Sequence, residues 1–232
     1  MSPTTAGVRP ALVPDTSLTG RAGAAGLRVL AAGAWPESAA DRVPPPIAGF
    51  VVSSFSPLAA ETARRCLERR PGSEAAADPV VTAVVVVSAL GDLAGAVHVA
   101  ETTDGGGRPG PLLFFQAVPN AVAGHVAALW RLTGPVVCVG DTDSGLDVAA
   151  LLIEDGDADE ALLIRVDQAH TAGGPDRAAA VLLAARPPDT DTDTDTDMDA
   201  PAGRAPGPAS PVPQDLGSRP GSGPHDHEGE QP

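Results

Sequence analysis

Two cysteines are the strongest nucleophiles in this sequence, and their surroundings predict that neither acts as one. Cys66 and Cys138 lack the paired spacing of metal ligands and the density of a disulfide-rich secreted protein. Cys138 lies within a run of valines, which predicts a strand that buries the thiol and keeps it inert. The alternative is an acyltransferase, a condensing enzyme or a hydrolase that uses Cys138, or residues brought in by a partner, as its nucleophile.

A short acidic segment, Asp141-Thr142-Asp143-Ser144-Gly145, follows that valine run. Its Asp-Ser-Gly triplet occurs in aspartic proteases, but these need two such aspartates and the chain has no second copy. The segment also begins like a calcium loop, but the glycine comes one place early and Leu152 stands where the loop needs glutamate. An acidic helix start, capped by Asp143 or Ser144, explains these residues, so we predict neither a metal nor a cofactor.

The other candidate polar groups lie on predicted helices. His125 stands one helical turn from Leu129 without a cysteine or carboxylate partner, which is typical of a packing histidine. Four arginines toward the end of another helix either dock an acidic carrier protein or complement the helix dipole. They are Arg64, Arg65, Arg69 and Arg70.

Composition limits the partners. The formal charge is -15, of which the ten acids and two arginines from Pro187 onward contribute -8. An acidic chain argues against nucleic acid or an anionic membrane surface as a partner. We find neither a signal peptide pattern nor an apolar run near the roughly 18 residues of a spanning helix, so we expect a cytoplasmic protein.

The chain organisation is one folded domain between two tails. Residues 1–25 lack periodicity and are expected to be a loose lead-in. Residues 187–232 alternate Asp with Thr and then become rich in Pro, Gly and Ser, which predicts a disordered acidic tail. The folded domain is therefore expected over 26–186.

Five strands and three helices are expected within that domain. The strands lie at 27–34, 80–88, 136–140, 161–167 and 178–185, and the second is so rich in valine that both its faces must be covered. The helices lie at 56–70, opening on Ser56-Pro57, at 120–132 and at 144–155. The last contains Leu146 to Ile153, apolar nearly all round, and must be covered on both sides.

The order of these elements predicts an α/β fold with helices on both faces of a five-stranded sheet. Strands joined by helical crossovers run parallel, and the last strand follows its predecessor directly, so it is expected to be antiparallel.

Three segments resemble successive landmarks of the β-ketoacyl synthases, which have the thiolase fold. They are the run from Pro119 to Ala127, then Thr133-Gly134-Pro135-Val136, then Asp155-Gly156-Asp157-Ala158-Asp159. The similarity covers roughly residues 25 to 186 and corresponds to the N-terminal half of such an enzyme. The resemblance implies a thiolase-like half, in which the last helix lies between this sheet and a second one.

The resemblance also implies that the catalytic cysteine is missing. In the family that cysteine opens the buried helix in a Thr-Ala-Cys-Ala-Ser-Gly context, and matching the Ser-Gly pairs places Thr142 at its position. A threonine hydroxyl without an adjacent base stays protonated near neutral pH. Chain-length factors also lack the cysteine, and they act by pairing with an active ketosynthase.

The sequence therefore predicts a non-catalytic ketosynthase-like subunit of polyketide or fatty-acid biosynthesis. Its expected partner is a thiolase-fold ketosynthase, in a homo- or heterodimer, with an acyl carrier protein as a further partner. An acyl-chain or carrier-protein binding module is the other alternative. The expected interface residues are Phe114, Phe115, Asn120, Leu146, Val148 and Leu152.

Overall fold

A computed structural model of the chain describes residues 16–71, 80–169 and 174–187. The described residues belong to one compact unit, and residues 189–232 lie outside the described residues. The predicted acidic tail is thus outside the described part of the chain from its second residue onward.

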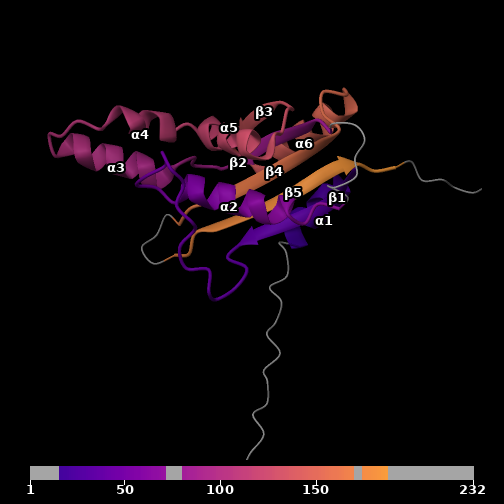
Figure 1. Cartoon of the computed structure of the whole chain (residues 1–232), viewed down its shortest axis with the longest axis horizontal. Coiled ribbons are helices and arrows are strands. Elements are labelled where there is room, and N and C mark those ends of the chain that lie inside the picture. The colour runs from indigo at the N-terminus through magenta and orange to yellow at the C-terminus, as the bar shows by residue number, and fades with distance from the viewer. Residues whose placement is uncertain (1–15, 72–79, 170–173, 188–232) are drawn as a thin grey trace, which may run out of the picture. The chain divides into compact units, whose positions relative to one another are not determined.

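A five-stranded sheet forms the centre of the domain (Figure 1). Its strands are β1 (Leu27–Trp35), β2 (Thr82–Val87), β3 (Val136–Val139), β4 (Glu160–Asp167) and β5 (Arg177–Ala185), in the spatial order β1-β5-β4-β2-β3. Strand β2 is parallel to both β3 and β4, whereas β5 is antiparallel to both β4 and β1. Strand β5 alone runs against the other four, which confirms the mostly parallel sheet with one antiparallel strand.

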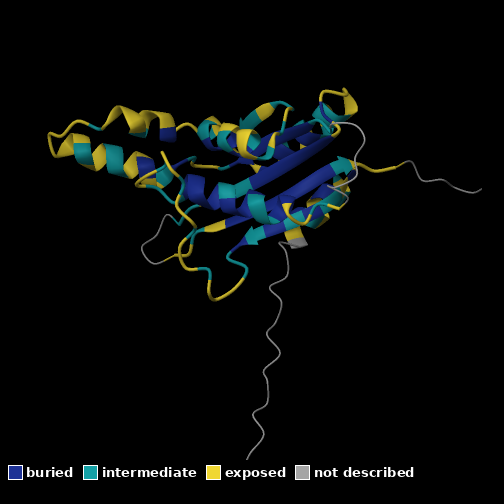
Figure 2. Ribbon diagram, in the orientation of Figure 1, coloured by how far each residue is buried: buried dark blue, intermediate teal, exposed yellow. Residues whose placement is uncertain are grey.

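Helices cover both faces of the sheet, as expected. They are α1 (Thr16–Ala24), α2 (Phe55–Leu67), α3 (Leu93–Asp104), α4 (Pro111–Gln116), α5 (Pro119–Trp130) and α6 (Thr142–Glu154). Helices α2 and α5 pack on one face of the sheet, and α1 and α6 pack on the other. All six residues of β2 are buried, which confirms that this valine-rich strand is covered on both sides (Figure 2).

Helix α1 corrects the expectation of a loose lead-in over residues 1–25. Leu18 and Ala22 have no accessible surface and pack with Leu27 and Leu183 beneath the sheet. The helix is only nine residues long and contains two glycines, so its apolar spacing is too short to stand out in the sequence. Residues 1–15 lie outside the described part of the chain.

The helix starts also differ from expectation. Asp141, rather than Asp143 or Ser144, caps α6, because its carboxylate accepts the backbone N–H of Ser144 at 2.9 Å. Helix α2 begins after Ser54, two residues before the expected cap at Ser56, and Ser54 makes no side-chain cap bond.

Two glycines have positions that no other residue could occupy without strain. A Cβ at Gly145 would lie 2.7 Å from Val87 Cγ2, so the glycine lets α6 approach the sheet closely. Gly156 has a φ of 77° and ends the turn after α6, as its place in the sequence predicts.

Helices α3 and α4 were not expected. They extend from the carboxyl end of β2 and are mostly exposed, because Gly95 is the only buried residue of α3 and Gln116 the only one of α4 (Figure 2). Helices that bury so little carry no clear apolar periodicity. No helix in the described ranges is both long and apolar enough to cross a bilayer.

Candidate functional site

The start of α6, where the family resemblance places a catalytic cysteine, is built as a helix cap. Thr142 is 8% exposed and is the first residue of the helix. Both carboxylate oxygens of Asp141 bond to Ser144, one to its backbone N–H and the other to its hydroxyl at 2.7 Å. These bonds hold the pKa of Asp141 below its ordinary value. The carboxylate is therefore committed to the helix start and is not arranged as a base for Thr142.

Asp143, the next acid of this segment, forms an ion pair with Arg21 of α1. This contact joins the two helices that share one face of the sheet. Among the described residues, no three His, Cys, Asp or Glu side chains lie close enough together to hold a metal ion. The acidic segment thus has structural contacts at each of its carboxylates.

Cys138 lies on β3, half-buried, with its Sγ 2.8 Å from Asn120 Oδ1 of α5. In this geometry the thiol donates to the amide oxygen. Burial raises the pKa of the Cys138 thiol, so the reactive thiolate is disfavoured at neutral pH. The surroundings of Cys138 therefore oppose the alternative in which it is a displaced nucleophile.

Cys66 lies on α2 and has no accessible surface. Burial raises the pKa of its thiol to about 12. This matches the structural role expected for Cys66, because a protonated and inaccessible thiol cannot attack a thioester. The role expected for His125 also agrees with the structure: its ring packs edge-on against Phe50 at 5.7 Å between centroids.

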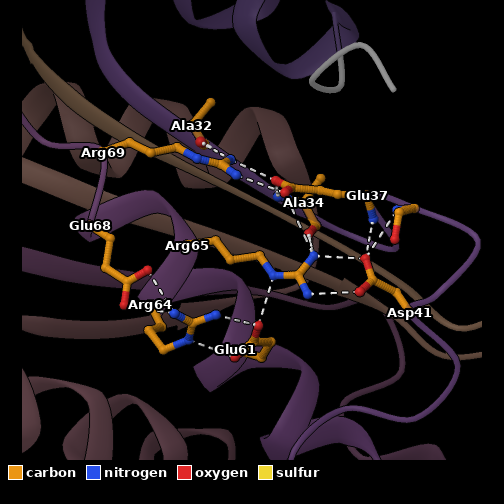
Figure 3. Close-up of polar contacts among 10 residues, drawn as sticks. Ala32, Ala34, Glu37, Asp41, Glu61, Arg64, Arg65, Glu68 and Arg69 are labelled. Carbon is orange, nitrogen blue, oxygen red and sulfur yellow. Dashed lines mark hydrogen bonds and ion pairs between the residues drawn. The ribbon is translucent and has the colours of Figure 1, made fainter. Parts of the chain in front are cut away.

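The arginines of α2 belong to a network of ion pairs within the chain (Figure 3). Arg65 is central to it: the guanidinium binds both carboxylate oxygens of Asp41 at 2.9 and 3.0 Å and donates to Glu61 at 2.7 Å. The same group lies 4.7 Å from the centroid of the Trp35 ring and donates to the Ala34 carbonyl. Arg65 thus joins the end of β1 and the following loop to α2.

The neighbouring arginines are also paired. Arg64 binds Glu61 and Glu68, and Arg69 binds Glu37 at 2.6 and 2.7 Å (Figure 3). These hydrogen bonds, from Arg64 to Glu61 and from Arg69 to Glu37, lower the pKa of both carboxyls. The internal carboxylates already neutralise these guanidinium groups, and docking of an acidic carrier protein on them stays a prediction.

Arg70, the last of the four predicted docking arginines, reaches the sheet. It pairs with the buried Glu160 at 3.1 Å, and Glu160 also accepts the Thr82 hydroxyl at 2.6 Å. Strands β2 and β4 are therefore joined at their amino ends by polar side chains as well as by the ladder.

A polar network that the sequence did not reveal lies at the opposite, carboxyl edge of the sheet. Ser53 donates to Asp92, Ser54 donates to Asp176 at 2.5 Å, and Gln168 donates to both serines. Two hollows, of about 400 and 490 Å³, lie beside it and share Gln168 in their walls. Its members are up to 122 positions apart, so no local spacing could have indicated it.

The expected interface residues divide into two groups. Phe114 and Phe115 of α4 are 77% and 68% exposed, and Asn120 of α5 is also exposed. Leu146, by contrast, is 2% exposed and packs on the chain's own sheet, so it cannot be presented to another molecule without unfolding. Val148 and Leu152 are half-buried and pack at the edge of the same core.

The outward side of α6 is more acidic than the sequence suggested. Asp143, Asp147, Leu151 and Glu154 follow one another along the exposed side of the helix. Of these only Leu151 is apolar, so this stripe is polar in the single chain, and the expected covering of α6 on both sides stays a prediction. A helix composed mostly of apolar residues can still carry its few acidic residues on one face.

A second surface is free of charge. From Pro109 to Gly140 the sequence contains no acid and a single arginine, Arg131. This segment forms α4, α5 and β3, which lie in a row along one side of the domain (Figure 1). We call these three elements the uncharged surface.

The uncharged surface is also apolar. Besides the two phenylalanines of α4, its exposed large apolar side chains are Leu112, Leu129 and Val136, and Val118 is exposed between α4 and α5. Strand β3 lies at one edge of the sheet. It pairs only with β2 among the described strands, so its other side is open.

Comparison with known proteins gives a match in structure but none in sequence. No protein-family model matches the chain, and no curated protein matches it. A chain in the complex of the ketosynthase ApeO with its chain length factor ApeC, from Xenorhabdus doucetiae, matches with a TM-score of 0.53 and 17% identity. The match covers 69% of this chain and 79% of that chain.

Two further solved structures show weaker likeness. A complex of the type II polyketide synthase ketosynthase AntDE with the acyl-carrier protein AntF matches with a TM-score of 0.49 at 14% identity, over 69% of this chain and 62% of that one. The ishigamide ketosynthase/chain length factor matches with a TM-score of 0.47 at 18% identity, over 60% of this chain and 45% of that one. This chain thus spans less than two thirds of the length of these two proteins.

The likeness to the ApeO–ApeC complex defines the class of fold. The described part of the chain has the mixed α/β, thiolase-like fold of the ketosynthases and chain length factors, over the region that resembles their N-terminal half. The fold expected from the sequence is confirmed.

Proposed function

We propose that this chain is a non-catalytic ketosynthase-like subunit that pairs with a thiolase-fold partner in polyketide or fatty-acid biosynthesis. The observation that carries the proposal is the uncharged surface formed by α4, α5 and β3. In a chain whose net charge is -15, a run of this length with only Arg131 charged is typical of the core of an interface.

The exposure of this surface supports pairing. Large apolar side chains that lie together on one side of a domain indicate a surface that another protein covers. Phe114 and Phe115 are two of the four phenylalanines in the chain, and both lie mostly in solvent on α4. The open edge of β3 adds backbone N–H and C=O groups that a neighbouring strand can satisfy.

The contacts of the three candidate nucleophiles support a non-catalytic role. Asp141 does not serve Thr142 as a base, because both of its carboxylate oxygens bond to Ser144. The thiols of Cys138 and Cys66 both have raised pKa values because they are buried. Any acyl transfer in the assembly would then take place on the partner subunit.

Co-purification tests the proposal. The chain is expressed with a ketosynthase encoded beside it, and the mixture is separated by size-exclusion chromatography with light scattering. We expect the two chains to elute together in a fixed ratio. A variant carrying both Phe114→Ser and Phe115→Ser should lose at least tenfold in affinity, because interface aromatics buried at the centre of a contact dominate its energy.

The matched control is Val43→Ser. Val43 is 80% exposed, and it lies in the segment after β1, outside the uncharged surface. It should leave the affinity unchanged. Two results would contradict the proposal. One is a chain that co-elutes with none of the ketosynthases encoded beside it, and the other is a double variant that binds as tightly as the parent.

A further inference from the structure

Strand β1 forms the edge of the sheet opposite the uncharged surface. It is the first strand in the spatial order and pairs only with β5 among the described strands, so its outer side has no partner strand. Residues 29–35 of this strand contain neither a charged residue nor a proline. An edge strand of this kind presents backbone N–H and C=O groups to which a strand of another molecule can add.

Side chains bind these backbone groups in the folded chain (Figure 3). Arg69 donates to the carbonyl of Ala32 at 2.9 Å, and Arg65 donates to the carbonyl of Ala34 at 3.1 Å. The carboxylate of Glu37 accepts the N–H of Ala34 at 3.0 Å. Alternate residues of a strand direct their backbone groups to the same side, so these bonds lie together on the outer side of β1. We call Glu37, Arg65 and Arg69 the edge block.

The edge block is held in place by its own ion pairs. Arg69 binds both carboxylate oxygens of Glu37 at 2.6 and 2.7 Å, and Arg65 is bound by Asp41 and Glu61. The hydrogen bond from Arg69 lowers the pKa of Glu37, so this acceptor is ionised at neutral pH. A strand that adds to the outer side of β1 must first displace these bonded side chains.

The first part of β1 opposes pairing in a different way. The register between β1 and β5 shifts between Val29 and Ala31, which makes Leu30 the extra residue of a bulge. A bulge twists an edge strand away from the geometry that a neighbouring strand needs. Arg28, just before it, is exposed and adds a charge to the strand.

We propose that the edge block closes β1 to strand addition and thereby keeps copies of this chain from polymerising through that edge. The inference goes beyond the proposed function, because it concerns the edge of the sheet that the uncharged surface does not include. It gives the arginines of α2 a role that does not involve an acidic carrier protein.

The open side of β3 makes such a block necessary. Strands β1 and β3 are the two unlike edges of one sheet. Contacts between unlike surfaces repeat from one molecule to the next, and they form open filaments unless the chain of contacts closes into a ring. A sheet with one blocked edge cannot extend in this way.

Self-association of the full chain tests the inference. The test variant carries Glu37→Ala and Arg69→Ala, which free the carbonyl of Ala32 and the N–H of Ala34. It removes one acid and one arginine, so the formal charge of -15 is unchanged. We expect its weight-average mass in light scattering to be about twofold or more above that of the parent and to rise with concentration.

The matched control is Arg64→Ala with Glu68→Ala. This change also removes one acid and one arginine, from an ion pair at 2.6 Å at the end of the same helix. The hydrogen bonds of Arg64 go to Glu61 and Glu68 rather than to β1. The control should keep the mass of the parent. Parent, test variant and control all carry Phe114→Ser and Phe115→Ser, so that association through the uncharged surface does not contribute.

Hydrogen exchange followed by mass spectrometry locates the contact. In the associated form of the test variant, the amides of residues 27–35 should exchange about tenfold more slowly than in its monomer, because they then join a ladder. Circular dichroism reports whether the test variant folds. If it does not, Glu37→Ala alone replaces it, since this change frees the N–H of Ala34 and leaves Arg69 in place.

Three results would overturn the inference. The first is a folded test variant, or a folded Glu37→Ala variant in its place, that has the mass of the parent at every concentration. The second is a control that associates as strongly as the test variant. The third is association without slower exchange in residues 27–35.

Discussion

The ion pair between Asp41 and Arg65 should contribute measurably to stability, and the contribution should depend on pH. The Asp41 carboxylate accepts hydrogen bonds from both terminal nitrogens of Arg65. It also accepts the backbone N–H groups of Glu37 at 2.7 Å and of Ser38 at 3.1 Å. These bonds, above all those from Arg65, lower the pKa of Asp41 to about 2. Its side chain is 15% exposed, so solvent screens the pair only in part.

The magnitude follows from linkage between protonation and folding. A pKa of about 2 in place of an ordinary Asp value near 3.8 corresponds to about 2 kcal/mol, at roughly 1.4 kcal/mol for each pH unit. Because the folded-state pKa is the lower one, this stability is fully present above about pH 4. It is lost as the pH falls from about 4 to about 2.

The assay is urea unfolding of the parent and Asp41→Asn at pH 7, 5 and 3. The free energy of unfolding of the variant should be about 2 kcal/mol lower than that of the parent at pH 7 and at pH 5, and this difference should be smaller at pH 3. Glu101→Gln, at an exposed position of α3, is the matched control and should change the free energy of unfolding by less than about 0.5 kcal/mol. A difference between parent and Asp41→Asn that is the same at pH 7 and pH 3 would refute the reasoning.

Three more predictions concern packing and thiol chemistry. Gly145→Ala should lower the free energy of unfolding by about 1–3 kcal/mol because its Cβ would meet Val87, whereas Gly124→Ala, which meets nothing within 4 Å, should be neutral or stabilising in the same urea titration. Leu18→Ala should cost about 2–5 kcal/mol in thermal or urea unfolding, and a cost below about 1 kcal/mol would show that α1 is not part of the core. A maleimide at pH 7.5 should leave Cys66 unmodified in the folded chain and label it after unfolding; labelling at equal rates in both states would contradict its burial.

The strands were predictable because each carries its own signal. Apolar runs such as those within Thr82–Val87 and Glu160–Asp167 occur where both faces of a sheet are covered, and the order of the strands along the chain then limits the topology. The single antiparallel strand followed from the short connection between β4 and β5. The elements that failed to stand out were α1, α3 and α4, which are short or bury little.

The candidate site was predictable only in part. The half-buried thiol of Cys138 agrees with the strand that its valine neighbours indicated, whereas α4, which carries the exposed Phe114 and Phe115, was not expected and their place in an interface stays a prediction. The partners of Arg65 and Arg69 were not foreseen, because Asp41 and Glu37 lie 24 and 32 positions away. Only the folded loop after β1 brings these carboxylates onto α2.

The sequence by itself determined the class of fold and the order of its strands along the chain, since apolar periodicity and turn residues are local signals that can be read without the three-dimensional structure. Tertiary structure decided which charges are neutralised, which side of α6 faces water, and which strand is left at the edge of the sheet. These depend on distances between residues far apart in the chain, and such distances exist only once the sheet has formed.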